Sequence, residues 1–493
     1  MRLTFRKSSI NSVKADAAVA FLHQDEKLLN SELRTLNKLY KNQIALVLQS
    51  GDFKGKHGEH LVVYVGKGAG SSRLILVGLG DKKNVSLEKY RQAAAIGAKK
   101  ARSLKSRSVV FEIPTQLQER ADSLLALAEG AYLSLYRFDK YFSKKKDEPV
   151  VDELILCATD NAVASLAPKV LAKAQILCEA TFLARDLENA PANEIYPETL
   201  AKAAKDSAEK NGYTATILDD FEIKDLGMGG IIGVSQGSAR PPRFIILEYG
   251  DRAKKPVVLV GKGVTFDTGG ISIKPAASMS EMKMDMSGAA AVIGTFEAVS
   301  RLTMPIHLVG LIPTVENMPS GTSVRPGDIL RHFNGKTSEV DNTDAEGRLI
   351  LADALGYAEK YKPSAVIDLA TLTGACVVAL GHYATGMMGN DDKLMKTLKI
   401  AGEKTYERVW RLPMFDEYEK LIKSDVADVK NTGGRWGGAI TAAWFLKSFI
   451  GDYKWCHLDI AGTAILEENL EYTPKGGSGI GVRLLTEFLR NWK

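Results

Sequence analysis

The sequence predicts an α/β protein with two domains: a smaller N-terminal α/β domain and a larger C-terminal α/β domain built on a central mixed, mostly parallel sheet. Three observations lead to this expectation. The chain has 493 residues, more than a single hydrophobic core usually serves. Short β-branched or apolar runs alternate with segments of helical periodicity. Several runs in the second half are continuously apolar, which is typical of strands covered on both faces.

The first part of the chain alternates between the two patterns. Strands are expected at 17–22, 60–65, 73–77 and 108–113, and helices at 87–104 and 117–136. A charged, proline-containing loop at 142–151 precedes one more expected strand at 153–157, and a long helical pattern follows at 163–187. We interpret that pattern as a connector. The predicted divisions are an N-terminal domain at 1–160, a connecting helix at 161–188 and the larger domain at 189–493.

The second domain repeats the α/β pattern with more glycine. Strands are expected at 215–218, 244–249, 257–260, 306–311, 365–369 and 455–460. The apolar run 257–260 leads directly into Gly261 and Lys262. Ligand sites in open α/β sheets gather outside the carboxyl ends of strands. The position of this charged motif therefore favours a functional interpretation.

Bulk composition narrows the classes of protein. The hydrophobic share is 45% and the net charge of +6 is spread over a long chain, which is weak evidence for nucleic-acid binding. No apolar signal segment begins the sequence and no apolar run is long enough to cross a bilayer, so we expect a cytoplasmic protein without a membrane partner. The cysteines stand far apart in apolar surroundings and are expected to be buried free thiols: Cys157, Cys178, Cys376 and Cys456.

The motif NTDAEGRL at 342–349 is the most informative stretch of the chain. It alternates two carboxylates, Asp344 and Glu346, with the guanidinium of Arg348. Acids within apolar sequence must be paired or bound to a cation, and divalent metals suit carboxylate clusters. A helix capping box at 343–346, ahead of a helical run at 349–360, explains the acids equally well when the motif is taken alone.

A second charged set lies upstream, in VGKGVTFDTGGISIK at 260–274 and MKMDM at 282–286. Asp267 also fits a turn aspartate before glycines, and Asp285 fits a charge at a helix N-terminus. Lys262 and Lys274 would ordinarily be surface residues. Beside two divalent cations, however, Lys262 would lose its proton and could ligate metal, whereas a charged Lys274 could face a developing oxyanion.

Other catalytic signatures are missing from the sequence. There is no His-Glu-x-x-His motif, and the seven histidines do not cluster, which argues against a histidine-rich zinc site. No predicted strand leads into a Gly-x-Ser-x-Gly nucleophile elbow, and a Walker motif is absent. The carboxylate and lysine set is therefore the remaining candidate for chemistry.

At these residues the chain resembles the leucine aminopeptidase (cytosol aminopeptidase) family. The similarity rests on the motifs at 260–274, 282–286 and 342–349, and further on ENMPSG at 316–321, DLATLTGA at 368–375 and DIAG at 459–462. It extends from about residue 185 to the C-terminus. Ser287 stands where many relatives have glycine.

The resemblance implies a two-metal aminopeptidase. Carried over by motif, Lys262, Asp267 and Asp285 bind one metal ion, Asp267 and Glu346 bridge to a second, and Asp344 also binds the second. Manganese, zinc, cobalt or magnesium can fill such sites. A hydroxide bridging the two metals would attack the peptide carbonyl.

The resemblance also assigns the remaining roles. Lys274 and Arg348 are expected to be the catalytic pair, with Arg348 holding a bicarbonate that serves as general base. Met282, Thr371 and Gly374 are expected to line an apolar pocket for a leucine-like side chain, although core packing explains the methionines of this region equally well.

The expected partners are peptides with a free N-terminus and further copies of the chain in a homohexamer. Two alternatives stay open at this point. One is a two-metal phosphoesterase, although such sites usually recruit histidine as well. The other is a nucleic-acid-binding or partner-binding protein in which peptidase activity is secondary, for which a steep salt dependence of DNA affinity would be the sign.

Overall fold

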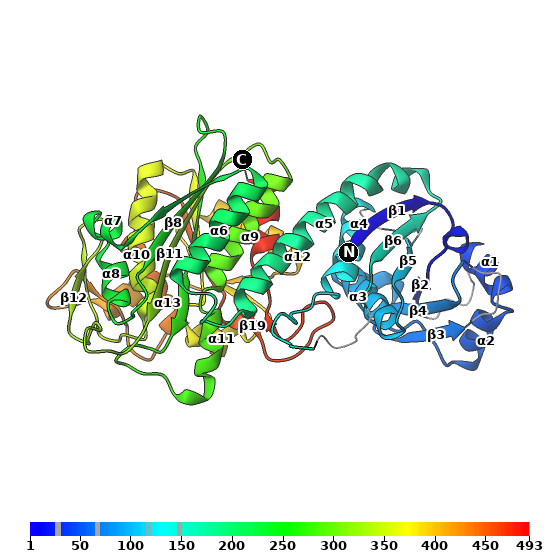
Figure 1. Cartoon of the computed structure of the whole chain (residues 1–493), viewed down its shortest axis with the longest axis horizontal. Helices are drawn as coiled ribbons and strands as arrows, with labels where there is room; N and C mark the ends of the chain where they lie inside the picture. The colour runs from blue at the N-terminus through cyan, green and yellow to red at the C-terminus, as the bar shows by residue number, and fades with distance from the viewer. Residues whose placement is uncertain (25–30, 65–69, 115–116, 118–119, 145–149, 493) are drawn as a thin grey trace. The chain divides into compact units, whose positions relative to one another are not determined.

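The computed structural model describes all residues except 25–30, 65–69, 115–116, 118–119, 145–149 and 493. The chain divides into two compact units (Figure 1). Unit 1 comprises 1–179 and 468–474, and unit 2 comprises 180–467 and 475–493. The expected strand 60–65, helix 117–136 and loop 142–151 each lie partly outside the described residues.

Unit 1 is built on a six-stranded sheet with the order β1-β6-β5-β2-β4-β3. Every neighbouring pair is parallel except β3 and β4, which are antiparallel. The strands are β1 (Arg2–Lys7), β2 (Ala17–His23), β3 (His60–Tyr64), β4 (Arg73–Gly80), β5 (Ser108–Glu112) and β6 (Glu153–Ala158). The first of these was not expected, because its polar sequence lies at a sheet edge and shows little of the apolar pattern of a buried strand.

Helices cover both faces of this sheet. On one face α3 (Leu87–Ser103) packs on β4 and β2, and α4 (Arg120–Leu133) packs on α3 and β6. On the other face lies a core that includes Leu36 of α1 (Ser31–Leu39) and Ile44 of α2 (Gln43–Ser50). The near-continuous apolar run of β2 is buried from both sides, as parallel strands require.

A segment from late in the chain completes unit 1. Residues 468–474 belong to this unit although the flanking residues belong to unit 2. Tyr472 is buried there, and its hydroxyl donates to Oε2 of Glu88 at 3.1 Å. Glu88 pairs with the buried Arg91, whose Nε donates to Glu129 at 2.8 Å. This network of buried charges is fully paired, which burial demands.

The long helix α5 (Asn161–Asn189) leads from one unit into the other and contains Pro168. The proline is the eighth residue of the helix and removes one internal N–H hydrogen-bond donor, yet the helix continues beyond it to Asn189.

Unit 2 is built on a nine-stranded sheet with the order β16-β15-β18-β14-β9-β11-β8-β7, with β10 also paired to β11. The central run β18-β14-β9-β11 is parallel, while β15, β8 and β7 each run antiparallel to a neighbour. The strands are β7 (Thr214–Leu218), β8 (Arg243–Gly250), β9 (Val257–Gly261), β10 (Gly263–Asp267), β11 (His307–Asn317), β14 (Ala365–Ala370), β15 (Thr385–Gly389), β16 (Val409–Arg411) and β18 (Trp455–Asp459).

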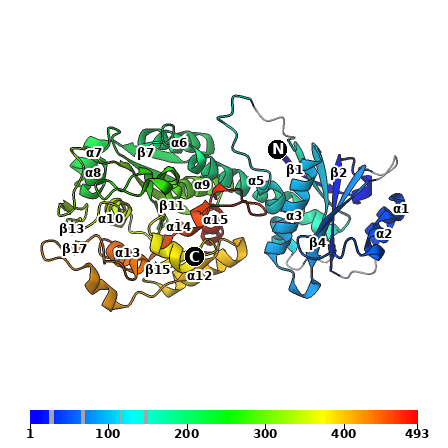
Figure 2. The ribbon, with the colours of Figure 1, turned by 90° about the horizontal axis from the view of Figure 1, so that it is seen from below.

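Helices lie on both faces of the large sheet (Figure 2). One face carries α6 (Pro197–Asn211), α9 (Ser287–Arg301), α12 (Asp392–Thr405) and α15 (Val482–Asn491). The other carries α8 (Gly229–Ser235), α10 (Glu346–Ala358) and α13 (Gly438–Lys447). Every residue of β14 and β9 is buried between these layers. This layered arrangement confirms the predicted α/β class with a mixed, mostly parallel sheet.

Short elements complete unit 2. They are α7 (Asp220–Asp225), the 3-10 segment η3 (Ala276–Met284), β12 (Ile329–Arg331), β13 (Thr337–Glu339), α11 (Gly374–Leu380), η5 (Asp416–Ile422), β17 (Val429–Lys430), α14 (Ala461–Ala464), β19 (Ile465–Leu466) and β20 (Gly476–Gly477). Strand β13 pairs antiparallel with β12 and parallel with β17. The four cysteines are buried thiols, as expected. Among the described residues, no helix has the length and apolar character needed to traverse a bilayer.

Candidate active site

The charged motifs converge at the carboxyl ends of the central parallel strands. Lys262 follows β9 directly, and Asp267 ends β10. Asp285 lies between η3 and α9, and Glu346 begins α10. The ends of parallel strands meet at one edge of a sheet, which is why residues distant in sequence can form one site there.

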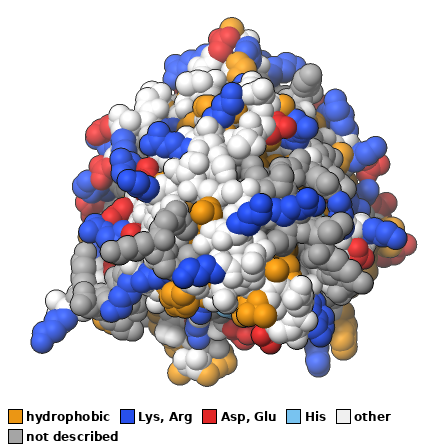
Figure 3. All heavy atoms as spheres, turned by 90° about the vertical axis from the view of Figure 1, so that its right-hand side faces the viewer, with side chains coloured by type: hydrophobic (Ala, Val, Ile, Leu, Met, Phe, Trp, Pro, Cys, Tyr) orange, Lys and Arg blue, Asp and Glu red, His pale blue; other side chains and the backbone are white. Residues whose placement is uncertain are grey.

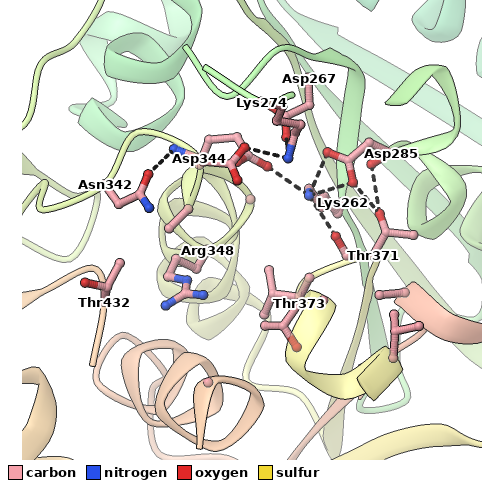
Figure 4. A pocket seen from close by; sticks show the side chains of 18 of the residues that line it. Lys262, Asp267, Lys274, Asp285, Asn342, Asp344, Arg348, Thr371, Thr373 and Thr432 are labelled. Atoms are coloured by element: carbon pink, nitrogen blue, oxygen red, sulfur yellow. Dashed lines mark hydrogen bonds and ion pairs between the residues drawn. The ribbon is translucent and has the colours of Figure 1, made fainter. Parts of the chain in front are cut away.

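One cavity of about 460 Å³ is lined by every catalytic, metal-binding and pocket residue that the sequence predicts (Figure 4). The predicted residues on its wall are Lys262, Asp267, Lys274, Met282, Asp285, Asp344, Glu346, Arg348, Thr371 and Gly374. The cavity is also lined by residues to which the sequence assigned no role, among them Asn342, Thr432, Gly434, Ala461 and Ile465.

Lys262 lies at the centre of one half of the site. Its Nζ donates to Oδ1 of Asp285 at 2.7 Å and to the carbonyl of Thr371 at 2.8 Å, and it lies 2.9 Å from Oε1 of Glu346. The lysine side chain is only 3% exposed. A buried ammonium of this kind is tolerated only because carboxylates and a carbonyl satisfy it.

The first turn of α10 can approach this lysine because residue 347 is glycine. A Cβ atom at Gly347 would lie 2.5 Å from Cε of Lys262 and 2.8 Å from its Nζ. Any side chain at this position would collide with the lysine or displace it. The glycine of the motif is therefore required by packing around the charged group.

Lys274 occupies the other half of the site. Its Nζ lies 2.9 Å from Oδ2 of Asp267 and 2.5 Å from Oδ1 of Asp344. Unlike Lys262, it is partly exposed. It therefore faces the cavity while still bridging two acids.

Three carboxylates converge most tightly. Asp267, Asp344 and Glu346 each present an oxygen, and these oxygens all lie within 4.8 Å of one another. Asp285 stands beside them on the far side of Lys262, which contacts both Asp285 and Glu346. Four carboxylates and two lysines thus share one small volume.

Burial and mutual charge move the pKa values of these groups apart. Burial, together with the neighbouring acids, raises the pKa of Asp285 to about 8 and that of Asp267 to about 6, against the opposing effect of the lysines. The pKa of Glu346 is lowered, because Lys262 and Lys274 outweigh its burial. Burial would lower the pKa of Lys262, but the surrounding acids outweigh it and raise the value. A bound cation would offset the repulsion between these carboxylates and favour their ionised forms.

The donor set fits divalent cations. Oδ2 of Asp285 and Oδ1 of Asp344 are buried and have no well-aligned hydrogen bond, although each lies within ion-pair distance of a lysine. Carboxylate oxygens are the ligands that magnesium and manganese prefer, and zinc also accepts them. The site therefore has the chemistry of a metal centre.

Arg348 reaches the cavity from the same turn of α10. Its guanidinium donates from one terminal NH₂ group to the carbonyl of Asn431 at 2.5 Å, while its Nε has no hydrogen-bond partner. Burial lowers the pKa of Arg348 to about 10. A buried guanidinium with donors left over is suited to hold a small planar anion.

The structure also decides between the simpler interpretations of these residues. The capping box is wrong: Ala345 is the residue before α10 and makes no side-chain cap, while Thr343 donates instead to the carbonyl of Gly269 at 2.6 Å. The turn interpretation of Asp267 is confirmed, because its Oδ1 accepts from the backbone N–H of Gly269 at 2.9 Å. Its functional interpretation stays a prediction.

The methionines of the second motif divide between core and cavity. Met284 and Met286 are buried, as the core interpretation expects, whereas Met282 lines the cavity.

Several of the residues that the sequence missed come from two distant segments. Ala461 belongs to the DIAG motif at 459–462, whose presence was noticed without a role, and Ile465 lies three residues beyond that motif. Thr432 and Gly434 belong to the glycine-rich stretch NTGGRWGG at 431–438, which was the available signal for a loop beside a ligand. Their assignment needed the fold, because about 85 residues separate this stretch from the motif at 342–349.

Fold and site together define a metal-dependent hydrolase. The chain belongs to the cytosol aminopeptidase family: the catalytic-domain model of that family matches residues 182–486, and its N-terminal-domain model matches residues 18–145. The chain is accordingly a metal-dependent aminopeptidase, and the predicted family and activity are confirmed. The phosphoesterase alternative is not favoured.

Relatives extend over the whole chain. A protein of Geobacter sp. (strain M21) named "Probable cytosol aminopeptidase" is 47% identical, with 90% of each chain covered. One of the same name from Roseiflexus castenholzii is 45% identical, covering 100% of this chain and 99% of the relative.

Solved structures agree with the sequence relatives. A tomato leucine aminopeptidase mutant superposes with a TM-score of 0.89 at 32% identity, covering 99% of this chain and 96% of that chain. The bottromycin maturation enzyme BotP in complex with Mn gives a TM-score of 0.86 at 34% identity, covering 97% and 99%.

Proposed function

We propose that the aminopeptidase uses two divalent metal ions held by the acids and the lysine of this cavity. Lys262, Asp267 and Asp285 would hold one ion, Asp267 and Glu346 would bridge, and Asp344 would complete the second. The observation that carries this proposal is the convergence of the oxygens of Asp267, Asp344 and Glu346 within 4.8 Å of one another. Lys262 extends the set toward Asp285 through its contacts with Asp285 and Glu346.

When bound, such a pair of ions would polarise the scissile carbonyl and lower the pKa of a water molecule toward neutrality. The chain's own residues would supply the remaining functions. Lys274, partly exposed beside Asp267 and Asp344, would donate to the oxyanion that develops on the carbonyl oxygen. Arg348, with an unpartnered Nε, would hold a bicarbonate that accepts and returns the proton.

The preferred substrate would be a peptide with a free N-terminus and a leucine-like first side chain. The cavity wall includes apolar or small residues: Met282, Leu372, Gly374, Val377, Ala461 and Ile465. An aliphatic side chain would lose its hydration against this wall, which favours binding by about 25 cal/mol per Å² buried.

Manganese, zinc, cobalt and magnesium are all candidate ions, and the manganese in the BotP structure supports testing manganese first. A cytoplasmic location agrees with the names of the relatives. A homohexamer is the proposed assembly. Nucleic-acid binding is not part of the proposal, since lysine and arginine side chains on the face of unit 1 shown in Figure 3 lie among acidic and uncharged ones.

One experiment tests the proposal directly. The purified protein is stripped with a chelator and titrated with Mn²⁺, while turnover of leucine, alanine and glutamate anilides and of a phosphate ester is followed. We expect two equivalents of metal per chain and fastest turnover of the leucine anilide. One equivalent, or preferential hydrolysis of the phosphate ester, would overturn the proposal.

A further inference from the structure

Asn431 lies behind the cavity, on a segment that runs beside the loop carrying Asp344. Strand β17 pairs in parallel with β13, and the backbone N–H of Asn431 continues this pairing by donating to the carbonyl of Glu339 at 2.9 Å. The residue is completely buried. It does not line the cavity, so it has no direct contact with a substrate held there.

The side-chain amide of Asn431 holds both ends of that loop. Its Oδ1 accepts from the backbone N–H of Asp341 at 2.7 Å and of Asn342 at 3.2 Å. Its Nδ2 donates to the carbonyl of Asn342 at 2.7 Å and to that of Ala345 at 3.4 Å. An asparagine amide has two acceptor sites and two donors, and here all four face one loop.

The backbone carbonyl of Asn431 fixes a second part of the site. It accepts from the guanidinium of Arg348 at 2.5 Å. Since Arg348 has no partner at Nε, this contact is a main determinant of where the planar group points. A single buried residue therefore holds the loop before α10 and the arginine in the first turn of that helix.

We propose that Asn431 is a positioning residue of this active site. Through its amide it fixes the loop 341–345, and with it the carboxylates of Asp344 and Glu346; through its carbonyl it fixes Arg348. The roles of those three residues rest on the proposed function. Metal-binding and catalytic groups must be held within about 0.5 Å of their working geometry, and irregular loops achieve this only when other residues lock them.

Residues 341–345 form an irregular loop, which makes this support necessary. They lie between β13 and α10, and neither the sheet nor the helix supplies partners for the backbone N–H groups of Asp341 and Asn342. Without the asparagine these backbone N–H groups would lose their hydrogen-bond partner, and the loop would shift.

Asn390, an exposed asparagine, provides a control with the same kind of hydrogen bonding. Its Oδ1 accepts from the backbone N–H of Trp455 at 2.7 Å, and its Nδ2 donates to the carbonyl of Tyr453 at 3.0 Å. It therefore also clamps a distant backbone segment. It follows the end of β15, beside the start of β18, and so lies at the edge of the sheet opposite the cavity.

The experiment compares Asn431→Leu, Asn431→Asp and Asn390→Leu with the parent enzyme. Leucine removes all four hydrogen bonds at similar size, whereas aspartate keeps the acceptors and loses the donors. The readouts are amide hydrogen exchange of 341–345, Mn²⁺ affinity measured against a chromophoric chelator, kcat and KM for the leucine anilide, and the melting temperature.

For Asn431→Leu we expect faster exchange at Asp341 and Asn342, together with about a 10- to 100-fold loss in Mn²⁺ affinity or kcat, as for other residues that orient metal ligands. Asn431→Asp should fall between this variant and the parent, and it serves as the test if the leucine variant does not fold. Asn390→Leu should lower the melting temperature while leaving loop exchange, Mn²⁺ affinity and kcat unchanged.

Two results would overturn the proposal. One is parental loop exchange, Mn²⁺ affinity and kcat in both Asn431 variants. The other is an Asn390 variant that reproduces the same losses at an equal drop in melting temperature. Failure of the two-metal function would appear differently, as a wrong metal stoichiometry in the parent enzyme. The exchange comparison between the Asn431 and Asn390 variants needs no metal.

Discussion

The Nζ atom of Lys262 lies 2.9 Å from Oε1 of Glu346, although 84 residues separate the two in the chain. The contact joins the end of β9 to the first turn of α10. It brings the end of β9 and the acidic motif at 342–349 close enough for one bound group to contact both. A ligand bound there must therefore be compatible with the lysine and with the carboxylates.

Glu346→Gln should remove metal binding and activity together. The substitution keeps the size of the side chain and removes the charge that lies between Lys262 and the other acids. We expect at least about a 100-fold fall in metal affinity or turnover, measured by metal analysis and initial rates. Glu359→Gln is the control, because that exposed glutamate follows the same helix. A fully active, metal-replete Glu346→Gln enzyme would refute the bridging role.

Lys274→Met should depress kcat more than it raises KM. The ammonium contacts Asp267 and Asp344 in the structure, and its contact with the substrate would strengthen only as negative charge develops on the carbonyl oxygen. Loss of one such donor typically costs about 10²- to 10³-fold in kcat. Steady-state kinetics on the leucine anilide checks this, with metal content measured in parallel. An unchanged kcat would remove the assigned role.

Arg348→Lys should not be silent. Lysine supplies the charge but lacks the planar fork that binds a small anion through two hydrogen bonds. Losing one charged hydrogen bond costs about 1.5–3 kcal/mol, so we expect roughly a 10- to 100-fold slower enzyme. The parent should respond to added bicarbonate at fixed pH and the variant should not. Parental rates in the variant without bicarbonate would contradict the assignment.

Asp459→Asn should loosen the apolar wall of the cavity. Oδ1 of Asp459 accepts from the backbone N–H groups of Leu372, Thr373 and Ala461, and its Oδ2 accepts from the hydroxyl of Thr373 at 2.6 Å. An amide nitrogen in place of one oxygen leaves at least one buried donor unpaired, at a cost of about 1–3 kcal/mol.

We expect Asp459→Asn to raise KM for the leucine anilide more than for the alanine anilide, and to lower the melting temperature. Equal changes for both substrates would mean that Asp459 supports the fold without shaping the side-chain pocket.

Glu188→Gln should change how stability depends on pH. Burial raises the pKa of Glu188 from 4.5 to about 8, although the N–H of Gly479 and the charge of Arg185 oppose the shift. A carboxyl whose folded-state pKa is raised contributes stability that is fully present below the unfolded value and is lost as pH rises through the folded value. The parent should therefore lose stability relative to the variant between about pH 5 and pH 8.

Melting temperatures across this range test the prediction, with Glu198→Gln in the exposed first turn of α6 as control. Parallel curves for the parent and Glu188→Gln would show that folding does not raise the pKa of Glu188.

Much of the fold was accessible from the sequence because buried strands carry an unmistakable pattern. The run Val257–Gly261 is continuously apolar, and it is a central strand covered on both faces. Edge elements were harder. Strand β1 carries charged residues at both of its ends and lies at an edge of its sheet, and β16 is only three residues long. These segments are strands because they pair with a neighbouring strand, and their composition alone does not predict this.

The charged part of the site was also accessible, because Lys262, Asp267, Asp285 and Glu346 are residues that a buried position tolerates only with partners. Asn431 was not, since nothing in its own surroundings distinguishes a clamp from a turn asparagine. Its partners lie about 85 residues away, and only the parallel pairing of β13 and β17 brings them together.

Residues 468–474 belong to unit 1 although the residues around them belong to unit 2, and this affects how the enzyme can be truncated. Removing residues 1–179 would take away Glu88, the hydrogen-bond partner of Tyr472. The side chain of Tyr472, which is buried in the intact chain, would then be exposed to water. A fragment that spans residues 180–493 would thus carry an exposed, aggregation-prone loop at 468–474, a few residues beyond Ile465 of the cavity wall. A truncated form of this peptidase therefore needs residues 468–474 to be replaced or redesigned first.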